Sequence, residues 1–360
     1  MRKSLEIAGA YIGLLVGAGF ASGQEVMQFF TSFGWGGLIG TGIATLLFAF
    51  LGVQIMQIGS RLQTVSHRDV IYHICGKYIG TGIDILVTFF LFGVATVMLA
   101  GSGSIFQQQF SISPVVGALI LTVLVILTLC LNVKKVISII SMITPLLLVL
   151  IFVITLYSVF TNHTDLGKLS DAADQQSAAP NWLMGGLLYV SYNIAAGISM
   201  LAIIGGTVKE KKVASLGGLL GGLGLGLLLF LINLALFMNA DKIQGADMPT
   251  LLLATDLSPV TGFLMTIALL GMIYNTAVGM LYAFTARFVQ PGTRKFKGSV
   301  VLVCLLSFCV SFIGFIQLVG SVYPVTGYLG FILIVAILFA WIKGSKDKHS
   351  ETADYEGKAL

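Results

Sequence analysis

The stretch Tyr11–Gln28, YIGLLVGAGFASGQEVMQ, lies in the long apolar run with which the chain begins. Lipid offers no partner for backbone polar groups, so such a run should be helical. Yet Gly17–Gly19 and Ser22–Gly23 stand at its centre, and Glu25 follows. A glycine inside a helix costs about 1 kcal/mol, and a carboxylate at membrane depth costs at least ~2.5 kcal/mol. The stretch therefore predicts a helix broken at its centre, whose free amides and carbonyls face a cavity.

The composition is that of an integral membrane protein. Of 360 residues, 57% are hydrophobic and 10% are charged, whereas soluble domains carry about 25% charged residues. A helix needs about 20 apolar residues to cross a bilayer. Ten runs satisfy this length, near 5–32, 36–59, 79–104, 113–131, 134–160, 181–207, 213–239, 260–288, 298–316 and 319–342. We expect an all-α integral membrane fold with ten transmembrane helices.

The basic residues give the orientation. Eighteen of the twenty Lys and Arg fall on one side of the ten-span arrangement, and Lys168 and Lys242 fall on the other. The positive-inside rule makes the basic side cytoplasmic, with both termini there. We expect a first five-helix repeat over 1–160, an extracellular loop over 161–180, a second repeat over 181–342 and a disordered cytoplasmic tail over 343–360.

The sixth span repeats the features of the first. It reads GGLLYVSYNIAAGISMLAIIGG, with Ser191–Asn193 and Ala195–Gly197 at its centre. Five spans separate the two polar centres, and an odd number places the second half upside down relative to the first. Interrupted helices at matching places in two inverted halves indicate the binding site of a transporter.

Counting along the spans places further polar residues at the same depth. Asn275 and Thr276 lie at the centre of the eighth span, and the third span carries Phe92 and Thr96, four residues apart. Polar patches at one depth favour a shared cavity. The candidate substrate-binding residues are Gly17, Ala18, Gly19, Phe20, Ala21, Ser22, Gly23, Glu25, Phe92, Thr96, Tyr192, Asn193, Ala196 and Gly197.

Several of these residues also have a structural interpretation. Glu25 is a proton carrier or the counter-charge of a cationic substrate; alternatively, it offsets the dipole of a half-helix and reaches water. The glycines of the first span could serve helix packing, as we expect of Gly217, Gly221 and Gly226 in the seventh span. Asn275 and Thr276 could bond a neighbouring helix rather than a cation.

Other classes of function lack their motifs. The sequence contains no P-loop, no zinc motif and no nucleophile with a partner base. We therefore expect neither ATP-driven pumping nor enzymatic activity, no nucleic-acid partner and no cofactor apart from a coupling ion. The four Cys form no CxxC pair, and the four His lie outside the apolar runs.

VGAGFASGQE in the first span, SYNIAAG in the sixth, ten spans and cytoplasmic termini resemble the amino acid–polyamine–organocation superfamily. Nearly the whole chain is similar to the YkvI-like bacterial membrane proteins. The resemblance implies a LeuT-type fold, a 5+5 inverted repeat with broken helices 1 and 6. Spans 1, 2, 6 and 7 would form a bundle, spans 3, 4, 8 and 9 a scaffold, and spans 5 and 10 gating arms.

The resemblance also implies a function. A secondary active symporter in the bacterial cytoplasmic membrane would hold a small amino acid or related amine between the unwound centres of helices 1 and 6, and a monomer would suffice. Coupling to Na⁺ would use Val16, Gly19, Asn275 and Thr276, whereas coupling to H⁺ would use Glu25. Two departures stand out, because Glu25 is not typical of amino acid permeases and the fifth span has no lysine. A ligand-binding sensor without transport is the alternative, and a passive channel is third.

Overall fold

The computed structural model describes residues 1–63, 67–131, 143–161 and 176–357, and the regular structure in these ranges is helical throughout. The ten expected spans correspond to these helices: α1 (Arg2–Leu15) with α2 (Ala18–Ser22) and α3 (Gln24–Phe29), α4 (Trp35–Leu62), α5 (His67–Phe110), α6 (Pro114–Leu131), α8 (Ile143–Thr161), α9 (Trp182–Gly206), α10 (Lys211–Met238), α13 (Pro259–Phe288), α14 (Arg294–Ser311) and α15 (Phe315–Gly357). A short 3₁₀ turn η1 (Thr31–Phe33) follows α3, and α11 (Ala240–Ile243) and α12 (Pro249–Leu257) lie between α10 and α13.

The described helices suit a bilayer. Within the described ranges, α4, the 80–110 part of α5, α10, α13 and the 315–339 part of α15 are each long and apolar enough to cross a membrane, and α9 qualifies as a bent sixth. Helix α6 leaves a run of large aliphatic side chains exposed, as lipid-facing helices do: Val115, Val116, Leu119, Ile120, Val123, Leu124 and Leu127. The expected membrane fold is confirmed, and ten spans are consistent with it.

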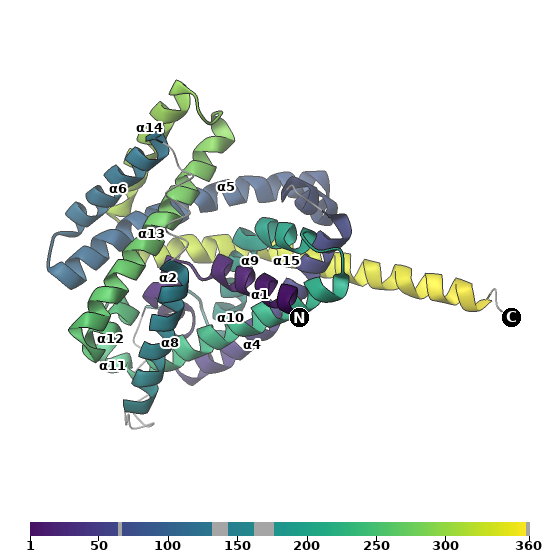
Figure 1. Cartoon of the computed structure of the whole chain (residues 1–360), viewed down its shortest axis with the longest axis horizontal. Coiled ribbons are helices and arrows are strands. Elements are labelled where there is room, and N and C mark those ends of the chain that lie inside the picture. Colours follow the sequence, from purple (N-terminus) through teal and green to yellow (C-terminus); the bar gives the residue numbers. More distant parts are fainter. Residues whose placement is uncertain (64–66, 132–142, 162–175, 358–360) are drawn as a thin grey trace.

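The helices pack in two groups. Helices α1, α4, α9 and α10 contact one another, and α5, α6, α13 and α14 form a second set. Helix α15 contacts α9 of the first group and α5 of the second, while α8 contacts α10 and α13. Figure 1 shows α6, α13 and α14 gathered on one side and α1, α4 and α10 on the other. This is the division into bundle, scaffold and arms that the resemblance implies.

Glycines let the first group pack closely. A Cβ on Gly221 of α10 would lie 2.5 Å from Cδ1 of Tyr11, and one on Gly218 would lie 2.6 Å from the carbonyl oxygen of Gly52. The Tyr11 hydroxyl donates to the carbonyl of Phe48 at 2.8 Å and so joins α1 to α4. The glycines of the seventh span therefore form a packing surface, as expected.

The structure differs from the sequence-based expectation for the tail, and it does not describe most of the expected outer loop. Helix α15 continues to Gly357, through residues where we expected a disordered tail. Adding residues to an existing helix is easier than starting one, since nucleation is the costly step. Most of the expected outer loop, 162–175, lies outside the described residues, as does the start of the fifth span.

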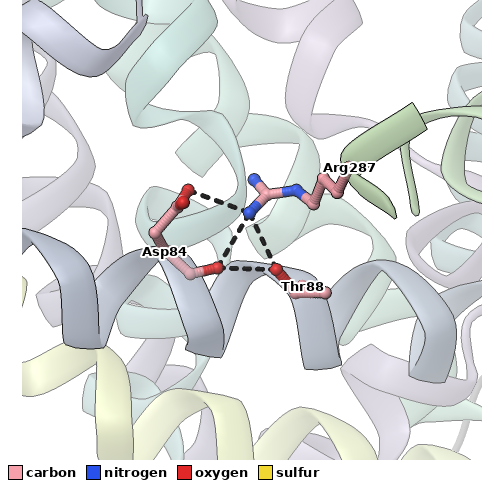
Figure 2. A network of polar contacts seen from close by, with 3 residues as sticks. All are labelled: Asp84, Thr88 and Arg287. Atoms are coloured by element: carbon pink, nitrogen blue, oxygen red, sulfur yellow. Dashed lines mark hydrogen bonds and ion pairs between the residues drawn. The ribbon is translucent and has the colours of Figure 1, made fainter. Parts of the chain in front are cut away.

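One polar network joins two helices of the second group. Figure 2 shows Arg287, in the last turn of α13, reaching Asp84 and Thr88 on α5. Its Nη1 atom donates to Asp84 Oδ1, to the Asp84 carbonyl and to Thr88 Oγ1, each at 2.8 Å. The side chains of Arg287 and Asp84 are 23% and 32% exposed, so water screens this ion pair incompletely. The network joins the last turn of α13 to α5.

Replacing Arg287 should loosen this attachment. Hydrogen bonds to charged groups contribute about 1.5–3 kcal/mol each when well shielded, and partial exposure reduces that value. We expect Arg287→Met to destabilise the protein by about 1–3 kcal/mol, visible as a lower midpoint of thermal unfolding in detergent. Arg294→Met, at an exposed arginine of α14, is the control. Equal midpoints for the two variants would contradict a clamping role for Arg287.

Candidate functional site

The first span breaks where its glycines predict. Helix α1 ends at Leu15, and Val16 and Gly17 are extended, with φ/ψ of −73°/90° and −97°/−178°. The short α2 then ends at Gly23, whose φ of +80° is disfavoured for residues with a side chain. A Cβ there would also lie 2.8 Å from Cγ2 of Thr250. Helix α3 begins only after this left-handed glycine, so the predicted break is confirmed.

The sixth span bends rather than unwinds. We expected non-helical backbone within 191–198, but α9 is helical there and turns by 57° between Ile198 and Met200. The polar side chains find partners without unwinding. Ser191 Oγ donates to the Gly327 carbonyl at 2.7 Å, and Asn193 Nδ2 donates to the Tyr189 carbonyl at 2.9 Å.

Glu25 lies where four helical segments meet. Its side chain, on α3, is buried, and its Oε2 accepts a hydrogen bond from the Tyr192 hydroxyl of α9 at 2.6 Å. The hydroxyl of Tyr323 on α15 interacts with the same carboxylate. On the remaining side Oε1 fills the space beside Gly19 of α2, where a Cβ would overlap it. The carboxylate thus connects the broken first span to α9 and α15.

Aromatic rings pack around Tyr192, the tyrosine that bonds this carboxylate. Tyr192 lies 4.8 Å from Tyr323, 5.4 Å from Tyr189, 5.6 Å from Phe29 and 6.5 Å from Phe90, measured between ring centroids. Among the described residues, no Lys, Arg or His forms an ion pair with Glu25. A buried charge without a partner is costly. The arrangement can therefore hold a proton on Glu25 or receive a cation beside it.

One end of the break is covered. Thr250, in the first turn of α12, donates from Oγ1 to the carbonyl of Ala21. The amide of Ala178 donates to the Gln28 carbonyl at 2.9 Å, so the segment just before α9 lies over α3. The short helix α12, which begins at Pro249, therefore covers this end of the break.

Other positions at the break keep some exposure. Gly17 is partly exposed, and a Cβ built on it would meet no atom within 4 Å. Ala196, at the centre of α9, is exposed. Asn275 and Thr276 are partly exposed, and neither side chain has a hydrogen-bond partner in the described part of the chain. These positions are therefore less closely packed than Gly19 and Glu25.

Four expected site residues are engaged elsewhere. Thr96 is buried and shares a 2.9 Å hydrogen bond with Ser307 of α14, and Phe92 stacks on Phe284 of α13 at 5.4 Å. Asn193 bonds its own helix. A Cβ on Gly197 would lie 2.7 Å from Leu15 Cδ2, so this glycine accommodates the end of α1.

Sequence reasoning missed Tyr323, Tyr189 and Thr250. Tyr323 lies beside Pro324 in the last span, where Ser321, Thr326 and Tyr328 are also polar, so nothing local distinguishes it. Tyr189 lies one turn before Tyr192, on the same face of α9. Thr250 follows Pro249 at a helix start.

The contrast between Gly19 and Gly17 can be tested. Gly19→Ala should displace the Glu25 carboxylate and weaken its bond to Tyr192, because the methyl group takes the place of Oε1. Overpacking of this kind costs about 1–3 kcal/mol, so we expect a lower thermal midpoint. Gly17→Ala, two residues away, should leave the midpoint nearly unchanged. If both alanines had the same small effect, the close contact between Gly19 and Glu25 would be refuted.

Comparisons with known proteins agree with this fold. No protein-family model matches the chain. Solved structures show the fold: a mutant of the Eremococcus coleocola manganese transporter (TM-score 0.60, 16% identity, 92% of this chain and 78% of that one), inward-facing Mhp1 (TM-score 0.58, 14% identity, 91% and 73%) and MhsT in complex with L-phenylalanine (TM-score 0.58, 16% identity, 94% and 98%). These neighbours are LeuT-fold transporters.

Two Bacillus subtilis proteins are similar over almost their whole length. The membrane protein YkvI is 26% identical over 336 residues, which cover 92% of this chain and 94% of YkvI. YyaD is 30% identical over 335 residues, which cover 91% of this chain and 94% of YyaD. The chain therefore belongs to the family of membrane proteins that includes YkvI and YyaD.

Proposed function

We propose that this protein is a secondary active transporter of a small amino acid or related amine, which binds between the break of the first span and the bend of α9. One observation carries the proposal. The buried Glu25 carboxylate, without a cationic partner among the described residues, is held by Tyr192 across these two helices. Transporters place their sites at such interrupted helices. The protein acts on no covalent bond, and one chain suffices.

The coupling ion is a proton carried by Glu25. An ionised carboxylate accepts hydrogen bonds, whereas a protonated one also donates. Gaining a proton therefore changes how Glu25 bonds the hydroxyls of Tyr192 and Tyr323. These bonds join α3 to α9 and α15, so protonation biases how the broken helix packs on its neighbours. The substrate would bias the same equilibrium from the adjacent space.

In this proposal, the segments that cover the break lie on the outer side of the membrane. By the charge distribution, both termini lie in the cytoplasm of a bacterium, and α12 with the 161–180 loop lies outside. The outer side is covered by Thr250 and Ala178. In an inward-open state, a solute would leave past the partly exposed Gly17 and Thr276. Two inverted repeats, 1–160 and 181–342, would generate this alternating access, and the last residues from 343 on would lie in the cytoplasm.

Na⁺ is the second candidate, favoured by different atoms. The carbonyl of Val16 accepts no backbone hydrogen bond within the described ranges, and the side chains of Asn275 and Thr276 are unpaired there. Helix α2, which begins two residues after Val16, contacts α13, the helix that carries Asn275 and Thr276. Against Na⁺, the Gly19 carbonyl already accepts from Ser22 Oγ at 2.7 Å.

The proton role is tested with Glu25→Gln in proteoliposomes. A stability screen of amino acids, amines and betaines first identifies the transported compound, because ligand binding raises the thermal midpoint. Glutamine keeps a hydrogen-bonding group of the same shape but cannot carry a proton. We expect exchange of the labelled compound to persist within a few-fold and accumulation driven by a pH gradient to fall at least tenfold.

Glu210→Gln, at an exposed residue before α10, is the control and should behave like the wild type. Unchanged accumulation in Glu25→Gln would contradict the proton role. Binding without any exchange in the wild type would instead indicate the ligand-binding sensor, since a sensor does not move its ligand across the bilayer.

The sodium candidate predicts a different result. If Val16 and Thr276 held Na⁺, NaCl would raise the thermal midpoint of the wild type relative to choline chloride, and Thr276→Val would abolish that difference. Because we propose a proton, we expect equal midpoints in the two salts. If NaCl raised the thermal midpoint and Thr276→Val removed that increase, the coupling ion would be Na⁺ at the site of Val16 and Thr276, and not a proton on Glu25.

A further inference from the structure

The outer half of the first span contains two buried glutamines whose side chains have atoms without a hydrogen-bond partner in the described ranges. Gln24 is fully buried, and neither its Oε1 nor its Nε2 has a partner in the described ranges. Gln28, one turn later, is equally buried and its Oε1 is unpaired. Unpaired buried polar atoms are rare in folded proteins, and water or a ligand commonly satisfies them.

The unpaired donor and acceptor atoms of Gln24 indicate which kind of ligand can satisfy them. Gln24 offers one donor group and one acceptor, whichever way its amide is turned. A bare metal cation would leave the NH₂ group unsatisfied, and a bare anion would leave the carbonyl oxygen unsatisfied. A water molecule donates and accepts, so it satisfies both ends.

The position of Gln28 connects this region to the outside. Its Nε2 donates to the carbonyl of Ile316 on α15 at 3.0 Å. Its Oε1 and the Nε2 of Gln176 lie 3.0 and 3.6 Å from the point where a Cβ on Gly320 would stand. Gln176 is exposed and belongs to the segment that covers α3. The glycine therefore leaves room beside an amide oxygen near the solvent-facing loop.

The same interface continues to Glu25. On α3, Glu25 lies three residues before Gln28, and Gln24 lies four residues before Gln28. Glu25 and Gln24 therefore lie on the same side of the helix as Gln28. On α15, Gly320 is followed three residues later by Tyr323, which interacts with Glu25. Gln176, Gln28 and Glu25 thus follow one another from the loop to the buried carboxylate.

We propose that Gln24 and Gln28 hold a short file of water molecules, beside Gly320, that conducts protons between the loop around Gln176 and Glu25. A proton enters from bulk water, each water accepts one proton and passes one on, and the last transfer forms the O–H bond on the Glu25 carboxylate. No water is consumed, and the glutamine amides stay neutral. This inference deepens the proposed function, since it rests on Glu25 as the proton carrier.

The test follows the exchange of the Glu25 carboxyl proton in D₂O. Infrared spectra of the protein in lipid are recorded at a pH where the carboxyl is protonated, and its C=O band is the one that Glu25→Gln removes. Gln28→Met fills the same volume without polar atoms and should slow the deuterium shift of this band at least tenfold. Gly320→Ala should slow it too, because its methyl group crowds the Gln28 oxygen.

Gln28→Glu separates conduction from structure. Both Glu and Met lack the N–H that bonds Ile316, although a protonated Glu can replace this bond with its O–H. Thermal midpoints of the two variants are therefore compared with their exchange rates, because equal midpoints with unequal exchange separate conduction from structure. A carboxyl group still bonds water, so we expect Gln28→Glu to exchange within threefold of the wild type. Gln57→Met, which breaks a 2.7 Å bond to Ser215 away from this interface, is the control for a lost glutamine bond.

The outcomes are decisive for the path. Exchange in Gln28→Met as fast as in the wild type would overturn it, and so would equal slowing in Gln28→Glu and Gln28→Met. Thermal midpoints of each variant establish that the protein compared is folded. Failure of the path leaves the uptake result for Glu25→Gln unaffected, so it is distinguishable from failure of the proposed function.

Discussion

The Tyr192 hydroxyl donates one hydrogen bond to the Glu25 carboxylate. Several unusual features of this molecule are needed for that bond to form. It requires a carboxylate at the centre of a membrane protein, where an unpaired charge is expensive. It requires Gly19, because a side chain there would occupy the position of the carboxylate. It also requires the first span to break, since a straight helix would not turn α3 toward α9 and α15. The sequence accepts several local costs to place one acidic group.

The packing around this bond places it between the two groups of helices. Helices α1, α9 and α10 belong to one group, while α5 and α13 belong to the other, held together by the Arg287 network. The broken span touches both groups, because α1 contacts α10 and α2 contacts α13. Glu25 sits at this junction with Tyr323 of the connecting helix α15. A change in its hydrogen bonding acts where the two groups meet.

Much of this arrangement follows from the sequence, and the reasons for the exceptions are physical. The first break was predictable, because Gly23 adopts a conformation that glycine favours and Glu25 marks the polar centre. The two packing groups follow from the family resemblance. The bend of α9 was misplaced, since Ser191 and Asn193 satisfy themselves without unwinding. Tyr323 was missed because it lies 298 residues from Glu25, and a contact at that separation leaves no local pattern in one sequence.

The most direct measurement is of proton movement during solute entry. Proteoliposomes containing a pH-sensitive dye receive the labelled substrate by a downhill gradient, with equal pH on both sides. The account predicts that the lumen acidifies as the solute enters, in a fixed ratio of protons to solute. Solute entry at the same rate with no change of lumenal pH would contradict the claim that Glu25 couples transport to protons.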